Sequence, residues 1–236
     1  MDKLKLYRGY DDQLGHLQVH SPTLGEICDY GEDLFFNLAY QFCAIPTDYM
    51  LELDEQGIKY EDLDEYSFFI NILFDFIDTY DVSILFPNLD MSSMELGVDK
   101  SGNVIRYNFL TGAQFDENDY KQVTAYLREM FGFKYQPRFA ATELTRTKML
   151  EVERLKRIQN AKKESSSYLL PLVSAMVNCA DFKYSHKDVW DMPFFAFMDS
   201  VKRVQAVRTA NQMFTGGYFG LKLSDVKEHL NWVRPL

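Results

Sequence analysis

The stretch YSFFINILFDFI, residues 66–77, is the most apolar segment of this 236-residue chain. It is too short to span a bilayer, which takes about 20 apolar residues, and Asp75 lies within it. Four acidic residues precede it within residues 61–65, where they suit the positive end of a helix dipole. The pattern therefore predicts a long, aromatic-rich helix over residues 61–80, buried in the core of a globular protein.

Further helices are predicted on both sides of this core segment. Thr23 and Glu26 have the spacing of a capping box. The apolar run at 32–45 stops before Pro46, which a helix interior does not tolerate. The chain beyond Asp116 has a helical pattern throughout, with helices expected at 116–130, 143–163, 167–179 and from Pro193 to Gly216–Gly217.

Strand-like patterns are confined to two places. Residues 1–20 alternate weakly around a turn-prone segment at 9–12, which predicts a short N-terminal hairpin. VDKSGNVIRY, residues 98–107, is the clearer hairpin, with two alternating runs around Ser101–Asn103. The fold class expected is mainly α with a small β element. We expect an acidic α+β region over 1–132 and a basic, all-helical region over 133–236, or one continuous domain.

Charge is divided unevenly along the chain. Residues 1–120 hold 24 of the 35 Asp and Glu residues but 6 of the 25 Lys and Arg residues. Such an asymmetry indicates a partner, so either the halves dock on each other within one chain or they dock between neighbouring copies. The overall pI of about 4.9 disfavours nucleic acid as a ligand, since phosphate binding needs an excess of cations.

No catalytic constellation stands out. Three cysteines, Cys28, Cys43 and Cys179, lack paired spacing, which favours free thiols in a reducing compartment over disulfides. His16 and His20 are four residues apart but lie in strand-like sequence, where that spacing separates them too far for a shared metal. The N-terminus lacks the apolar run of a signal peptide, so a cytoplasmic protein is expected. Because no nucleophile motif is found, we expect a protein without enzymatic activity.

Three acids recur at every third position near the end of the core segment. Asp75, Asp78 and Asp81 would form the solvated stripe of an amphipathic helix in the simplest interpretation. They could instead bind Mg²⁺ for hydrolysis. In a third interpretation they pair with Lys and Arg of the 143–163 helix.

Several strings have the order and spacing of a known family. HSPTLGEICDYGEDLFF (20–36) resembles the opening signature of tail-module proteins from siphophages of Gram-positive bacteria. FMDSVKRVQAVRTANQMFTGGYFG (197–220) and LNWVRPL (230–236) are similar to that family's closing motifs. CAIPTDY (43–49), VTAYLREMFG (123–132) and SSYLLPLVSAMVN (166–178) continue the resemblance, so it covers nearly the whole chain.

This resemblance implies a late phage protein, a tail assembly chaperone. Its partner would be the tape-measure protein, kept soluble in the host cytoplasm during tail morphogenesis. The tail tube protein and further copies of the chain could be additional partners. No cofactor is implied. Two alternatives stay open, a minor structural protein retained in the virion tail and a metal-dependent hydrolase.

The interacting surface predicted from the sequence lies on the basic helix at 143–163 and at the C-terminus. That helix is polar with a thin apolar face, as expected of a surface that covers a partner's exposed stripe. The same apolar residues could equally pack the protein's own core. The predicted residues are Met149, Leu150, Arg154, Leu155, Arg157 and Trp232.

Overall fold

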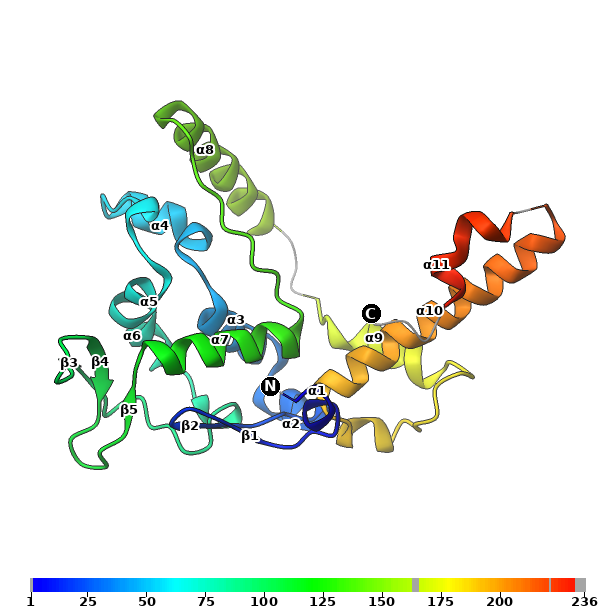
Figure 1. The fold of residues 1–236 in the computed structure, drawn as a ribbon, viewed down its shortest axis with the longest axis horizontal. Coiled ribbons are helices and arrows are strands. Elements are labelled where there is room, and N and C mark those ends of the chain that lie inside the picture. Colours follow the sequence, from blue (N-terminus) through cyan, green and yellow to red (C-terminus); the bar gives the residue numbers. More distant parts are fainter. Residues whose placement is uncertain (1, 163–165, 221, 232–236) are drawn as a thin grey trace. The chain divides into compact units, whose positions relative to one another are not determined.

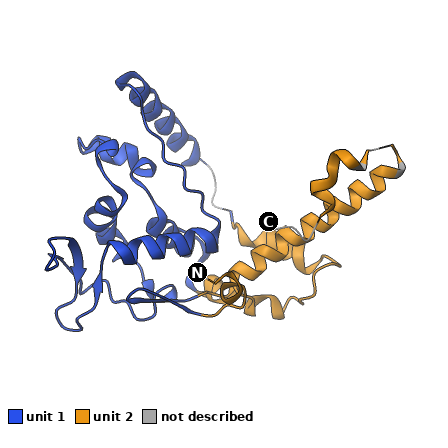
Figure 2. Ribbon diagram, viewed as in Figure 1, with its two compact units in different colours: residues 1, 11–20, 30–166 blue, residues 2–10, 21–29, 167–236 orange. Residues whose placement is uncertain are grey.

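The computed structural model describes residues 2–162, 166–220 and 222–231, which form two compact units (Figure 2). Unit 1 consists of residues 11–20 and 30–166, and unit 2 of residues 2–10, 21–29 and 167–236. The acidic and basic regions expected from the sequence meet at 132/133, which lies inside unit 1. Two N-terminal segments belong to unit 2 with the C-terminal third of the chain.

The fold class is confirmed: helices dominate, and the strands form two small antiparallel sheets (Figure 1). No helix within the described residues is both long and apolar enough to cross a membrane. Unit 1 contains, in chain order, β1 (Asp12–Leu14), β2 (Leu17–Val19), α3 (Glu32–Cys43), η1 (Pro46–Tyr49), α4 (Met50–Glu55), η2 (Tyr60–Asp62), α5 (Glu65–Phe68), η3 (Phe69–Leu73), α6 (Phe74–Ile77), η4 (Val82–Ile84), β3 (Glu95–Val98), β4 (Val104–Tyr107), β5 (Gln114–Phe115), α7 (Glu117–Phe131) and α8 (Glu143–Asn160).

The apolar stretch forms a helix over 65–77, shorter than the 61–80 predicted, because Asp64 caps it through the Ser67 amide. Residues 60–62 are a separate short 3-10 turn. The middle of the helix, η3, is a π-turn between α5 and α6. Arg106 from β4 donates two hydrogen bonds to the Ile70 carbonyl of this turn, at 3.2 Å and 2.8 Å. A buried guanidinium therefore ties the core helix to the three-stranded sheet.

Aromatic side chains fill the core of unit 1. The Phe69 ring lies at its centre, stacked on Phe115 at 5.5 Å and tilted against Tyr120 at 4.9 Å. It also contacts Phe42 of α3 at 5.7 Å. These rings come from a π-turn and from α3, β5 and α7, so one buried cluster joins segments from four parts of the chain. The removal of such large apolar rings from water is the main source of stability for a core of this kind.

The predicted hairpin at 98–107 is confirmed, with Val98 opposite Val104 in the β3–β4 register. The two-residue β5 adds to the free side of β4, so the sheet order is β3-β4-β5. The N-terminal hairpin is also present but lies at 12–19, with its turn at Gly15 and not at 9–12. Residues 3–7 form α1 (Lys3–Tyr7) because Asp2 caps a helix there. The prediction of a strand before the segment at 9–12 was therefore wrong.

Unit 2 is built around one long helix. Its elements are α1, α2 (Leu24–Tyr30, whose last residue lies in unit 1), α9 (Leu169–Val177), η5 (Asp188–Asp191), α10 (Phe194–Tyr218), η6 (Leu223–Val226) and α11 (Lys227–Leu230). The capping box predicted at Thr23 is confirmed, since Glu26 accepts from the Thr23 amide at 2.7 Å and Thr23 Oγ1 from the Glu26 amide. Thr23 also forms an isolated antiparallel bridge with Pro193, which fastens the start of α2 to the start of α10.

Candidate protein-binding site

The basic helix predicted at 143–163 is α8, which spans Glu143–Asn160 at the margin of unit 1 (Figure 1). Thr142 is its N-cap, accepting from the Thr145 amide at 3.2 Å. Eighteen residues at about 1.5 Å each give α8 a length of roughly 27 Å. One side of the helix packs against α4.

The side of α8 that faces α4 is held by ion pairs. Arg146 is nearly buried and lies 2.7 Å from Asp54 Oδ1, with Glu61 at 3.7 Å. Arg157 pairs with Glu52 at 2.9 Å one turn from the C-terminal end of the helix. Basic residues of the second half of the chain thus pair with acidic residues of the first half within one chain. These acidic residues belong to α4 and η2.

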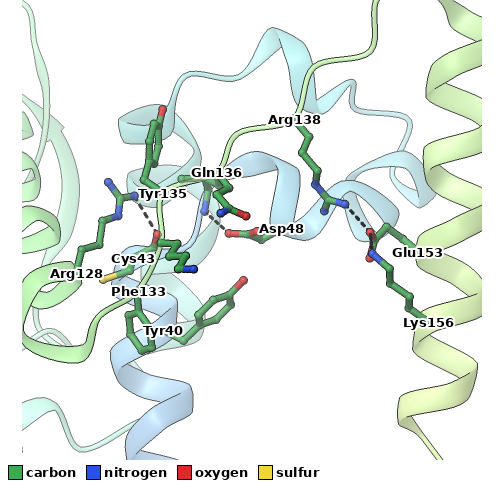
Figure 3. A pocket seen from close by; sticks show the side chains of 12 residues that line it. Tyr40, Cys43, Asp48, Arg128, Phe133, Tyr135, Gln136, Arg138, Glu153 and Lys156 are labelled. Atoms are coloured by element: carbon green, nitrogen blue, oxygen red, sulfur yellow. Dashed lines mark hydrogen bonds and ion pairs between the residues drawn. The ribbon is translucent and has the colours of Figure 1, made fainter. Parts of the chain in front are cut away.

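Hydrogen bonds also hold the linker between α7 and α8 in place. Arg138 donates to Glu153 of α8 at 2.6 Å and lies within reach of the Thr47 carbonyl at 3.4 Å. Lys156 donates to the same Glu153 carboxylate at 2.9 Å. Arg138, Glu153 and Lys156 line a polar cavity of about 400 Å³ between α3, α7, the linker and α8 (Figure 3).

The other polar groups of this cavity are engaged in holding its walls. Arg128 donates to the Cys43 carbonyl at 3.0 Å and lies over the Tyr135 ring at 4.8 Å (Figure 3). Asp48 accepts from the Ile45 amide at 3.0 Å. Burial raises the pKa of the Cys43 thiol to about 12, so this sulfur is protonated at neutral pH and is a poor nucleophile.

The opposite side of α8 is exposed and carries an interrupted apolar stripe, with Lys148 and Glu151 lying between Leu144 and Leu155. Leu144, Leu155 and Ile158 are spaced by 11 and 3 residues, which puts them on one face of an α-helix. Each side chain is more than half exposed. Beside this stripe, Phe139 of the linker, Met149 and Val152 line an open groove of about 500 Å³. The ion pairs to α4 therefore turn this interrupted stripe outward.

The residues predicted to bind a partner lie on different sides of α8 or outside it. Leu150 is buried against the protein's own core, and Arg154 and Arg157 are paired with the carboxylates of α4. Met149 is half-buried in the groove and Leu155 lies on the outer stripe. Trp232 is outside the described residues. Phe139 was missed because it precedes the helix, where no periodicity marks it.

The acidic stripe of the core segment does not meet α8. Asp75 pairs with Arg106 at 2.8 Å, and Asp81 caps η4 through the Ser83 amide. The interpretation that pairs these acids with the 143–163 helix was therefore wrong. Within the part of the chain that the structure describes, the one group able to gather metal ligands is instead His16, Asp116 and Asp119.

That His–Asp group is occupied by hydrogen bonds. Asp119 is fully buried, and its carboxylate accepts from the His16 amide at 3.1 Å, from His16 Nδ1 at 2.9 Å and from the Asp116 amide at 3.1 Å. His20 pairs separately with Asp11 at 2.6 Å. The contacts of Asp119 fasten the first hairpin and the start of α7 together.

Comparison of the chain with protein families, with curated proteins and with solved structures finds no match.

Proposed function

We propose that the protein is a phage tail assembly chaperone that binds the tape-measure protein through the outer face of α8. The observation that carries this proposal is the exposed stripe of Leu144, Leu155 and Ile158 on a helix whose other side is fixed to α4. Such a face recognises a partner helix with apolar residues at i, i+3 and i+4 spacing. The motif order along the chain supports the choice of a phage tail protein.

The physical need for such a binder lies in the partner. A long helical protein with exposed apolar stripes aggregates unless the stripes are covered. A helix of roughly 27 Å covers about five turns of a partner helix. Binding without covalent chemistry, in the cytoplasm of the infected host, satisfies this role, and it needs no cofactor.

Co-expression with the tape-measure protein, followed by affinity purification, tests the proposal. The wild-type chain should retain the tape-measure protein in the supernatant and co-purify with it. The double variant Leu155→Glu, Ile158→Glu should lower the co-purified amount at least about tenfold, because buried charges oppose apolar docking. Leu170→Glu is the matched control, since Leu170 is similarly exposed on α9 in unit 2. Undiminished binding by the double variant would contradict the proposal.

Two alternatives give different results. A minor structural protein of the tail would be found by mass spectrometry of purified virions, whereas a chaperone would be missing from them. A metal-dependent hydrolase would release heat when Mg²⁺ or Mn²⁺ is titrated into the protein. The hydrogen bonds and ion pairs that already occupy Asp75, Asp81 and Asp119 favour binding over hydrolysis.

A further inference from the structure

A hydrogen-bonded loop between β4 and β5 carries the most exposed large apolar side chain described in this chain. Leu110 is 94% exposed and its neighbour Phe109 is 73% exposed. Isolated exposed apolar residues are common on proteins, but two adjacent ones on one ordered loop form an apolar patch that a partner can bury.

Asn108 holds this loop in one conformation. Its side chain is 2% exposed, and its Oδ1 accepts from the Leu110 amide at 2.8 Å and the Thr111 amide at 3.1 Å. Its Nδ2 donates to Ser93 Oγ at 2.6 Å. The backbone of Asn108 closes the loop with two further bonds of 2.9 Å, to Gly112 and Ala113. A preorganised loop loses little conformational entropy when it docks.

The surroundings of the loop are acidic. Asp90 and Glu95 are both exposed, and Glu95 lies opposite Tyr107, whose ring contacts Phe109 at 5.0 Å. Arg106 is buried and paired with Asp75. The matching partner is thus an apolar groove with a basic rim, and an anionic lipid surface would be repelled.

The groove on α8 has these properties. Its apolar floor is Phe139, Met149 and Val152, and its charged groups are Arg138, Lys148 and Glu153. Arg138 and Lys156 both donate to Glu153, so together with Lys148 the groove has three cations and one carboxylate. A space of about 500 Å³ is large enough for the side chains of Phe109 and Leu110.

We propose that the loop of residues 108–113 docks into the α8 groove of a second copy of this chain. The sheet β3-β4-β5 and α8 lie well apart in unit 1 (Figure 1), so the loop cannot fill the groove of its own chain. Each copy then offers one loop and one groove, which gives a head-to-tail contact that grows into a ring or a filament. The acidic first half of one copy meets the basic helix of the next.

Two variants separate the halves of this contact. The loop variant Phe109→Ser, Leu110→Ser keeps the groove, and the groove variant Phe139→Glu, Val152→Glu keeps the loop. All four side chains are substantially exposed, so neither variant removes core packing. Leu144→Ser, on the neighbouring stripe of α8, is the matched control.

Sedimentation velocity over a concentration series is the test. The wild-type chain and Leu144→Ser should grow in mass with concentration, and each double variant should require at least about tenfold higher concentration to associate. An equimolar mixture of the two variants should give a one-to-one dimer that does not grow. A wild-type monomer up to about 1 mM would overturn the proposal. So would a mixture that stays monomeric, or a Leu144→Ser variant that no longer associates.

This contact is independent of the proposed function. The loop and groove variants retain Leu155 and Ile158, and the tape-measure variant retains Phe109, Leu110, Phe139 and Val152. Loss of self-association and loss of tape-measure binding are thus observed in different proteins.

Discussion

The Nδ1 atom of His16 lies 2.9 Å from Oδ2 of Asp119, which joins the turn of the first hairpin to the first turn of α7. The two residues are 103 positions apart in the sequence. Gly15, with φ of +56°, makes the contact possible, because a β-carbon at this position would collide with the Asp119 carboxylate. The hairpin is thus attached by a buried carboxylate and by a close approach that only glycine allows.

Asp119→Ala should lower the free energy of unfolding by about 2–3 kcal/mol, measured by chemical denaturation. The substitution leaves the His16 and Asp116 amides without their acceptor and removes half of the capping box of α7. Glu117→Ala is the control, since its exposed pair with Lys121 contributes less than about 0.5 kcal/mol. Equal effects of the two substitutions would show that Asp119 does not fasten the hairpin.

The same pair makes stability depend on pH. The hydrogen bond to Asp119, with nearby negative charge, raises the pKa of His16 above its ordinary 6.5. A raised pKa means that the stabilisation is complete below about pH 6.5 and is lost as pH rises through the folded-state pKa. The unfolding free energy of wild type should exceed that of His16→Ala by more at pH 5.5 than at pH 8.5, by about 0.5–1 kcal/mol for this half-exposed ring. A pH-independent difference would contradict the ion pair.

Arg146→Ala should loosen α8 from α4. Arg146 is the least exposed arginine of the helix, and its loss leaves Asp54 and Glu61 partly buried without it, at a cost of about 2 kcal/mol. Amide hydrogen exchange should accelerate in α8 and stay unchanged in α7. Arg154→Ala removes an exposed contact to the same Asp54 and should have less than about 0.5 kcal/mol of effect. If both variants behave alike, burial of Arg146 is not what fixes the helix.

Arg106→Met should destabilise unit 1 by about 1–3 kcal/mol, because the Ile70 carbonyl of the π-turn loses both hydrogen bonds from the guanidinium. The guanidinium also lies over the Phe74 ring at 4.5 Å. Arg106→Lys should recover part of the loss, since an ammonium can reach one carbonyl but cannot donate in parallel. Thermal unfolding of the three proteins checks the order. A lysine variant as unstable as the methionine variant would indicate that the planar fork is essential and that charge alone contributes little.

Local signals predicted the helix boundaries well where a cap is coded within three or four residues. Thr23 and Glu26 form the predicted capping box, and the helix predicted at 116–130 begins where Asp116 is its N-cap. The failures have other causes. The π-turn at 69–73 is bonded to Arg106, more than 30 residues away. In α1, one capping contact from Asp2 outweighs a weak strand-like alternation.

The sequence predicts that the candidate site is a helix, but it does not predict which side of that helix is exposed. The apolar residues of α8 cover both sides, and the sequence alone does not indicate which side faces the protein. That choice is made by Asp54 and Glu52 of α4, which lie far earlier in the chain. Phe139 and the loop at Phe109–Leu110 lie outside any periodic segment, so their exposure depends on the tertiary structure.

The way unit 2 is assembled sets an order of events during synthesis. Residues 2–10 and 21–29 leave the ribosome well before their partners in α10, which begins at Phe194. At about 5–20 residues per second, translation of the intervening segment takes roughly ten seconds or more. Throughout that interval the Thr23–Pro193 bridge cannot form, so α1 and α2 lack their contacts with α10. A nascent chain stalled before Pro193 should therefore be cleaved by proteases within residues 2–29, and one released after α10 should be protected there.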